Sequence, residues 1–226
     1  MCTLLFRFSP NDQYPLAILS NRDEAYKRPS GGWAWRGGNR RYFAPVDLEA
    51  GGTWIGLNES GVVAALTNIF PRLRGSSFRS RGALVIDLLH LDAANLSWDV
   101  LPEAVSNHQY NKFNLLVADR SVAYLFTWRG RNLVQRDLTP GVYEVANRPF
   151  RGRSIPDDVA EGNEGWLAMK ASRLVEHPFV CKHGRGYGTC SSHKLLVHGT
   201  DRSKSLVWHL DGHPCESRYK LVMGTE

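Results

Sequence analysis

The first 24 residues constrain the fold more than any other stretch of this chain. Two short apolar runs between residues 3 and 19 are separated by turn-forming residues, and the tetrapeptide Asn-Arg-Asp-Glu follows at positions 21–24. This pattern predicts a hairpin or a pair of neighbouring strands. Because neighbouring strands bring distant residues side by side, we expect Cys2, at the start of the first strand, to lie beside Arg22 and Asp23.

Such a meeting has a specific chemical meaning. If Met1 is removed, Cys2 carries both a thiol and an α-amine, and the pKa of a free α-amine suits a general base at neutral pH. Arg22 favours the thiolate by charge attraction, and Asp23 is suited to hold the amine by a charge-assisted hydrogen bond. The alternative is that Cys2 is an ordinary small apolar residue in a buried strand and that positions 21–24 form a polar turn.

Length and composition limit the number of domains, the cellular location and the kinds of partner. The chain has 226 residues, which suits one domain covering residues 1–226, and its net charge is +6. No apolar run is long enough to span a bilayer and no secretory signal is evident, so we expect a cytoplasmic protein without integral membrane association. No nucleic-acid-binding motif accompanies the basic charge, so we expect no nucleic-acid partner. The sequence does not indicate an oligomeric state.

Strands and helices alternate in blocks along the chain, which favours an α+β fold. Residues 26–38 are rich in Pro, Gly and Trp and predict a surface loop. Residues 52–57 and 62–68 predict a hairpin. Helical spacing predicts helices over residues 80–92, 99–107 and 164–176. Further strands are predicted over residues 113–118, 122–128, 132–137, 142–146, 194–197, 205–210 and 219–222.

Several of these segments together resemble the NRDE family, also called the transport and Golgi organisation protein family. The segments are Met-Cys-Thr-Leu at positions 1–4, the tetrapeptide at 21–24, and Trp-Ile-Gly-Leu-Asn-Glu-Ser-Gly at 54–61. Val-Ala-Asn at 145–147 and Tyr-Gly-Thr-Cys-Ser-Ser at 187–192 match later motifs of that family. The resemblance covers essentially the whole chain.

The NRDE family in turn resembles the N-terminal-nucleophile hydrolases, especially the bile-salt hydrolase and penicillin V acylase branch. This resemblance implies a four-layer αββα sandwich of two antiparallel sheets. It implies that Cys2 is the nucleophile and that Asp23 binds the freed α-amine. Arg22 lies near the thiolate-stabilising arginine, although that branch has its arginine at the position of Ser20.

The same resemblance implies an oxyanion hole made by the backbone N–H of Asn68 and the side chain of Asn147. Members of the family usually have Arg after Tyr-Gly-Thr, where this chain has Cys190. The missing charge weakens thiolate stabilisation and lowers the expectation of ordinary amide hydrolysis.

The sequence also contains cysteines and histidines that could together form a metal site. Cys181, His183, Cys190 and His193 are followed by further ligand types at His209, His213 and Cys215. Their spacing fits none of the familiar zinc-binding pairs, so the sequence predicts no metal site and no cofactor.

Two functions follow from these residues. The first is an amidohydrolase that cleaves a C–N bond of a small, partly apolar substrate through a thioester on Cys2. The second is a non-catalytic protein of the same fold that binds haem, lipid or acyl-CoA. In either case, we expect Trp33, Trp35, Trp54 and Cys190 to line the ligand site.

Overall fold

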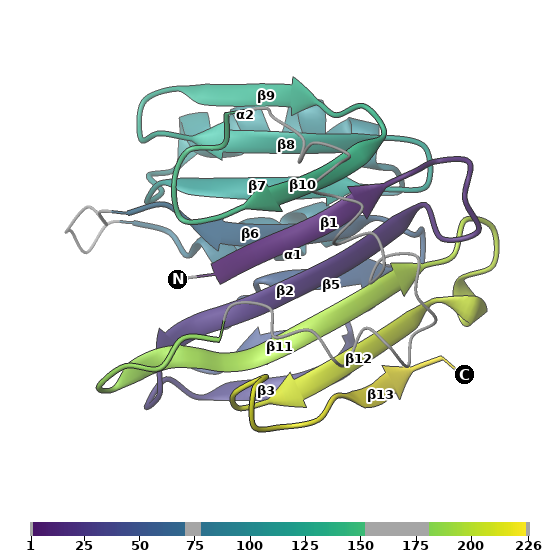
Figure 1. Cartoon of the computed structure of the whole chain (residues 1–226). Coiled ribbons are helices and arrows are strands. Elements are labelled where there is room, and N and C mark those ends of the chain that lie inside the picture. Colours follow the sequence, from purple (N-terminus) through teal and green to yellow (C-terminus); the bar gives the residue numbers. More distant parts are fainter. Residues whose placement is uncertain (1, 71–77, 152–180, 225–226) are drawn as a thin grey trace.

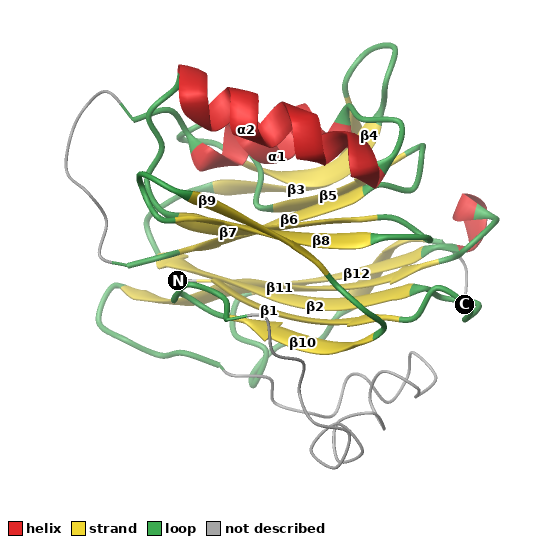
Figure 2. Ribbon diagram, turned by 90° about the horizontal axis from the view of Figure 1, so that it is seen from above, coloured by secondary structure: helices red, strands yellow, loops and turns green. Residues whose placement is uncertain are grey.

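Two antiparallel β-sheets lie face to face in this protein (Figures 1 and 2). The computed structural model describes residues 2–70, 78–151 and 181–224. The six-stranded sheet has the order β10 (Gly141–Val145), β1 (Cys2–Phe8), β2 (Leu16–Ala25), β11 (Tyr187–Val197), β12 (Leu206–Asp211) and β13 (Lys220–Met223). The seven-stranded sheet runs β3 (Ser30–Arg36), β4 (Tyr42–Asp47), β5 (Ile55–Asn58), β6 (Val63–Asn68), β7 (Phe113–Ala118), β8 (Ala123–Trp128) and β9 (Leu133–Asp137).

The main core fills the space between the sheets. Side chains alternate between the two faces of a strand, so the even-numbered residues of β1 point inward. Leu4, Phe6 and Phe8 are buried there against residues of the opposite sheet such as Phe43 and Ile55. Burial of this apolar surface fixes the register of β1, because a one-residue slip would turn the whole set outward.

Two helices cover the outer face of the seven-stranded sheet (Figure 2). They are α1 (Arg81–Leu89) and α2 (Ser97–Asn107), and a short 3-10 turn, Ala94–Leu96, precedes α2. Leu84 and Leu88, four residues apart on one face of α1, are fully buried against strand residues such as Ala64. Within the described ranges, no helix is both long and apolar enough to cross a membrane.

The fold class expected from the sequence is confirmed in its two antiparallel sheets. The helices expected over residues 80–92 and 99–107 are present with shifted ends. The described residues form three layers, since the helix expected over residues 164–176 lies outside them.

Two predictions about strands were wrong. The expected loop over residues 26–38 contains β3, which pairs with β4 across an irregularity between Gly31 and Ala34. Glycines and tryptophans that favour a loop in the sequence are accommodated because β3 is an edge strand with exposed positions. The strand expected to begin at Lys194 begins at Tyr187, because residues 187–193 pair with the end of β2.

Candidate active site

Cys2 lies directly opposite Arg22 where β1 and β2 meet at one end of the six-stranded sheet. Opposed residues of an antiparallel pair share a face, and this face is the one turned toward the other sheet. The turn between the two strands sets this register, since Phe8 pairs with Leu16 at the other end. The sequence therefore places the thiol and the guanidinium together through local strand pairing.

Both side chains line a cavity of about 330 Å³ at that end of the sandwich. Trp54 and Asn68, from the opposite sheet, also line it. Four residues expected to belong to the site thus face one cavity: Cys2, Arg22, Trp54 and Asn68.

The Arg22 guanidinium is buried with spare hydrogen-bonding capacity. Arg22 is 3% exposed, and its Cζ lies 4.8 Å from the centroid of the Trp54 ring. Its Nη2 donates to Asp47 Oδ2 at 3.4 Å, whereas Nη1 is buried without a hydrogen-bond partner among the described residues. A buried charged donor without a partner is costly, so Nη1 is suited to meet an anionic group of a ligand.

Asp47 is shared between two arginines. Arg28 Nε donates to Asp47 Oδ2 at 2.7 Å and Arg28 Nη2 donates to Oδ1 at 3.2 Å. Burial opposes ionisation of Asp47, but hydrogen bonds from Arg28 and from the Ala50 amide, with the charges of Arg28 and Arg22, lower its pKa overall. Arg28 Nη1 also contacts Glu49 Oε1 at 3.4 Å, so Asp47 and Glu49 together face the guanidinium groups of Arg22 and Arg28.

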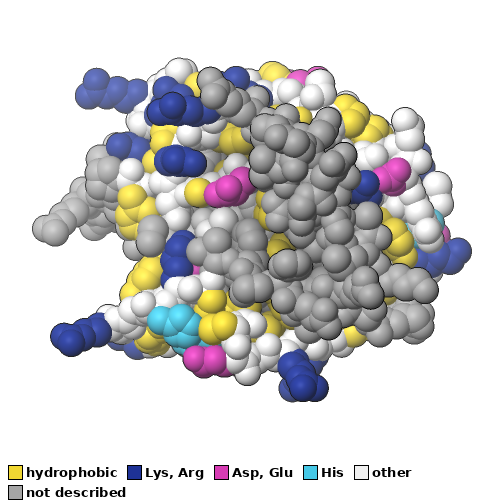
Figure 3. All heavy atoms as spheres, in the orientation of Figure 1, with side chains coloured by type: hydrophobic (Ala, Val, Ile, Leu, Met, Phe, Trp, Pro, Cys, Tyr) yellow, Lys and Arg dark blue, Asp and Glu magenta, His cyan; other side chains and the backbone are white. Residues whose placement is uncertain are grey.

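Arginines outnumber carboxylates in the lining of the cavity, and two of them, Arg28 and Arg79, also pair with carboxylates outside the lining, Glu49 and Asp87. Its lining includes the four arginines Arg22, Arg28, Arg79 and Arg81 and the two carboxylates Glu24 and Asp47. Figure 3 shows Lys and Arg side chains along the left-hand edge, where this end of the sandwich lies. Such a lining concentrates anionic ligands.

The Cys2 thiol itself is protonated in this environment. Cys2 is 6% exposed, and burial raises the pKa of its thiol. The Asp23 charge adds to this effect, while a hydrogen bond from the Asp23 backbone and the Arg22 charge oppose it. The thiol therefore needs a base before it can attack a substrate.

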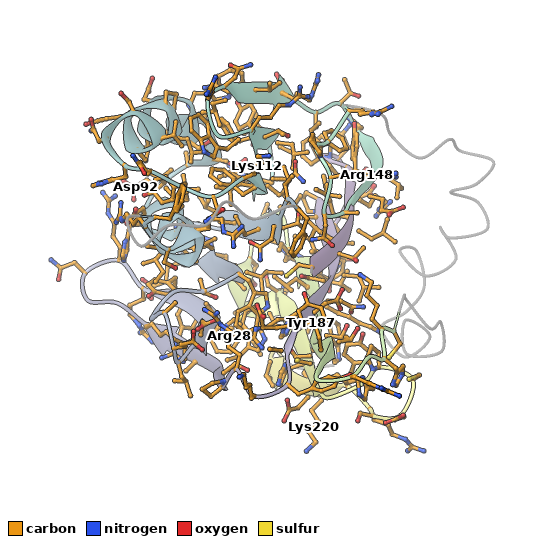
Figure 4. The ribbon with its side chains drawn as sticks, turned by 90° about the vertical axis from the view of Figure 1, so that its left-hand side faces the viewer. Arg28, Asp92, Lys112, Arg148, Tyr187 and Lys220 are labelled. Carbon is orange, nitrogen blue, oxygen red and sulfur yellow. The ribbon has the colours of Figure 1, made fainter. Side chains whose placement is uncertain are left out.

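Asp23 faces the other side of the sheet from Arg22, because side chains alternate along β2. Its carboxylate is fully buried, accepting from Lys182 Nζ at 2.6 Å and from Thr189 Oγ1 at 2.7 Å. The Tyr187 hydroxyl donates to the Asp23 carbonyl at 2.6 Å. Figure 4 looks onto this end of the molecule, where Tyr187 and Arg28 are both labelled.

Asn147 and Asn68 are in direct contact. The Asn147 Nδ2 donates to the Asn68 carbonyl at 2.7 Å, so one of its two N–H groups is already used. Asn147 does not line the cavity. Asn68 lines it, and its Oδ1 is buried without a partner among the described residues.

The remaining expected site residues lie apart from this cavity. Trp33 is packed against the core, and its indole N–H donates to His193 Nδ1 at 2.9 Å. Trp35 is 42% exposed and lines a different hollow with Met223. Cys190 sits at an irregularity in the pairing of β11 with β2, and its thiol donates to the Glu24 carbonyl at 3.3 Å.

Sequence reasoning missed Asp47, Arg28 and Lys182. Asp47 ends β4, a strand that was not predicted, and it reaches Arg22 across 25 positions of the chain. Lys182 precedes β11 and contacts Asp23 across 159 positions. Among the residues that contact Arg22 or Asp23, Thr189 could have been found from the sequence, because it belongs to the Tyr-Gly-Thr motif at positions 187–189.

Comparison with known proteins places this chain in a family. Residues 1–170 match the model of the family described as Transport and Golgi organisation 2. The chain is 36% identical over 247 residues to the Transport and Golgi organization protein 2 homolog of Bos taurus, covering 87% of this chain and 88% of that protein. It is also 36% identical over 159 residues to the homolog of Homo sapiens, covering 65% of this chain and 57% of that protein.

Solved structures share the fold. Penicillin V acylase from Agrobacterium tumefaciens superposes with a TM-score of 0.51 at 12% identity, covering 93% of this chain and 83% of that chain. A mutant of conjugated bile acid hydrolase from Clostridium perfringens gives a TM-score of 0.57 at 11% identity, covering 93% of this chain and 89% of that chain. Identities this low establish a common architecture and leave the chemistry to the site itself.

Proposed function

Because the chain belongs to the Transport and Golgi organisation 2 family and shares the fold of N-terminal-nucleophile hydrolases, we propose that it hydrolyses an amide through a thioester on Cys2. One observation carries the proposal. Cys2 and Arg22 face the same cavity as a directly opposed pair, and Arg22 keeps a buried donor without a partner among the described residues.

The proposed reaction requires removal of Met1. The free α-amine of Cys2 then takes the thiol proton, and the thiolate sulfur attacks the substrate carbonyl carbon. The C–N bond breaks, and the amine leaves with the proton held by the α-ammonium group. Water then hydrolyses the thioester and restores the thiol. Asp23 holds the α-amine in this proposal, and the Asn68 N–H stabilises the oxyanion; Asn147 joins it only when its side chain turns from the Asn68 carbonyl toward the cavity.

The cavity indicates the class of substrate. Arg22 and the other arginines favour a substrate with an anionic group, while Trp54, Leu66 and Phe78 offer apolar surface. Its volume of about 330 Å³ suits a small molecule. We therefore propose a small amide with an apolar acyl part and a carboxylate or phosphate.

Turnover of N-acyl amino acids by the processed protein tests this proposal. We expect Cys2→Ala to reduce turnover by roughly 10⁴-fold or more, because the nucleophile is lost. Cys190→Ala is the matched control, since its thiol is bonded to the Glu24 carbonyl and does not line the cavity. Equal turnover by Cys2→Ala and the unsubstituted protein contradicts the proposal.

A second function, binding without catalysis, is favoured by a different observation. Burial raises the pKa of the Cys2 thiol, and Asn147 already donates to the Asn68 carbonyl. The same cavity then holds an anionic acyl or haem ligand, such as acyl-CoA or haem, without attack by sulfur. Titration of Cys2→Ala with haemin and with acyl-CoA tests this function. Absence of any spectral shift or binding removes it.

The cytoplasmic location remains a prediction. Fractionation of cells expressing the full chain tests it, with recovery in the cytosolic fraction as the expected result. Recovery in a membrane-enclosed fraction contradicts the prediction.

A further inference from the structure

Two pairs of potential metal ligands flank the β11–β12 hairpin in mirrored order. Cys181 and His183 precede β11, whereas His213 and Cys215 follow β12. Each pair has one residue between its members, and the two pairs read Cys-x-His and His-x-Cys. Because β11 and β12 are antiparallel neighbours, both pairs reach the same end of the sheet.

The hairpin is tied together close to this point. Ser191 pairs with Asp211 at the end of the ladder, and the Gly212 amide donates to the Cys190 carbonyl at 2.8 Å. Histidine side chains lie beside a carboxylate side chain at the lower left of Figure 3, at this end of the sheet. The strand register therefore holds the two ligand pairs against each other.

Three of the ligand atoms already form a tight triangle. The distance from Cys181 Sγ to His183 Nε2 is 3.3 Å, from His183 Nε2 to Cys215 Sγ is 3.0 Å, and from Cys215 Sγ to Cys181 Sγ is 3.1 Å. Zinc bonds of about 2.3 Å to sulfur and 2.0–2.1 Å to nitrogen give tetrahedral edges of roughly 3.4–3.8 Å. Small outward shifts of exposed side chains bring the triangle to that size.

His213 is a fourth possible ligand beside Cys181 and His183. Its ring lies 4.1 Å from the His183 ring between centroids, and a ring nitrogen lies within 4.8 Å of the ligand atoms of Cys181 and His183. The Nδ1 of His213 is buried and has no hydrogen-bond partner among the described residues. The His213 ring therefore has a nitrogen that no hydrogen bond in the described residues occupies, and imidazole nitrogens are common metal ligands.

We propose that Cys181, His183, His213 and Cys215 bind one zinc ion in a tetrahedral Cys₂His₂ site. Two thiolates with two imidazoles are the donor set of structural zinc sites. Binding forms four bonds to Zn²⁺ and releases the thiol protons of Cys181 and Cys215 to solvent. The zinc closes the open end of the β11–β12 hairpin. The sequence predicted no such site, because the spacing of these residues fits none of the familiar zinc-binding pairs.

The proposed site has a consequence for the buried carboxylate of Asp23. Lys182 lies between the ligands Cys181 and His183, and its ammonium contacts Asp23 at 2.6 Å. Its backbone is also tied to Thr189, by N–H donation to Thr189 Oγ1 at 2.9 Å and by acceptance from the Thr189 amide at 2.9 Å. The metal fixes the residues on both sides of Lys182 and so holds its ammonium on Asp23, one position from Arg22.

Zinc content of the full chain, purified without chelator, tests the proposal. We expect about one zinc ion per chain, and Co²⁺ in its place should give the visible and near-ultraviolet bands of a tetrahedral two-thiolate site. Cys181→Ser and Cys215→Ser should each lose stoichiometric zinc, and removal of zinc from the unsubstituted chain should lower its melting temperature by roughly 5 °C or more.

Two variants serve as matched controls. Cys190→Ser removes a cysteine outside the cluster, and Glu216→Gln removes the carboxylate that lies near His183 and Cys215. Both should keep full zinc content. Zinc-free protein that takes up no zinc when it is added overturns the proposal, as does a Cys181–Cys215 disulfide in place of the metal. Full zinc content in the Cys181→Ser, Cys215→Ser double variant also overturns it.

Discussion

Two charged neighbours at the end of β2, Arg22 and Asp23, lie on opposite faces of the six-stranded sheet and differ in how completely they are hydrogen-bonded. On the inner face, Arg22 lines a cavity and keeps Nη1 without a partner among the described residues. On the outer face, the next residue, Asp23, is bonded to Lys182 and Thr189. Ser192, also on the outer face, lies within hydrogen-bond distance of Asn21 and Tyr219.

This difference separates groups that stabilise the fold from a group suited to bind a ligand. A buried carboxylate that meets an ammonium and a hydroxyl has its desolvation offset within the protein. The desolvation cost of a buried guanidinium with an unpaired N–H group is not offset within the protein. An anionic group of a ligand offsets it by accepting that hydrogen bond. Substitutions on the outer face should therefore change stability first, and substitutions on the inner face should change ligand affinity first.

The largest expected effect is on the outer face, at Lys182. Lys182→Met leaves the buried Asp23 carboxylate without its ammonium partner, so we expect the free energy of unfolding to fall by about 3 kcal/mol. Urea unfolding followed by circular dichroism measures this change.

Lys204→Met is the matched control. Lys204 pairs with Asp201 at 3.4 Å, but both side chains are largely exposed. We expect the control to change stability by less than about 0.5 kcal/mol. Equal effects of the two substitutions would remove the distinction between a buried structural pair and a surface pair.

The second effect is on the inner face, at Arg22. Arg22→Met should weaken binding of a fluorescent fatty-acid carboxylate by about 10- to 100-fold, because a charged hydrogen bond is lost. Binding of the corresponding uncharged methyl ester should change little. Arg36→Met removes the same charge from β3 outside the cavity and should leave both affinities unchanged. Parallel losses for carboxylate and ester would show that Arg22 acts through packing alone.

The smallest effect concerns His193, which faces inward beside Trp54. Burial lowers the pKa of His193 well below 6.5, and the charges of His209 and Arg22 add to the shift. The unfolded chain binds a proton near pH 6.5 and the folded chain does not, so stability falls as the pH drops below that value. From pH 6.5 to 5.5 this group should cost about 1 kcal/mol.

Unfolding of the His193→Gln variant isolates the contribution of His193 to the pH dependence of stability. The variant should lose less stability than the unsubstituted protein over the same pH interval, since no imidazole is present to take up the proton. Identical pH dependence in both proteins would mean that His193 titrates normally and that the inner face carries no excess positive potential.

The sequence could predict the pairing of Cys2 with Arg22 because that contact is local. One turn joins β1 to β2, and the apolar runs on both sides set the register. The sequence could not predict that Asp47 meets Arg22, because β4 is recognised as a strand only once β3 and β5 lie beside it.

The cysteine and histidine cluster shows the same limit. The sequence contains several possible ligands between Cys181 and Cys215, but their spacing matches no familiar zinc-binding pair. The observed neighbours of Cys181 and His183 come from the far side of the β11–β12 hairpin, at His213 and Cys215. Strand pairing decides those contacts. The sequence underestimated the length of β11 by seven residues, because it predicted that the strand begins at Lys194.

Mass spectrometry of the purified protein after brief reaction with the activated monoester of an aliphatic dicarboxylic acid, which keeps one free carboxylate, tests the central claim most directly. The account predicts a chain that lacks Met1 and carries one acyl group on Cys2, with the label greatly reduced in Arg22→Met. A chain that retains Met1, or one in which Cys2 stays unlabelled while Cys181, Cys190 or Cys215 reacts, would contradict it.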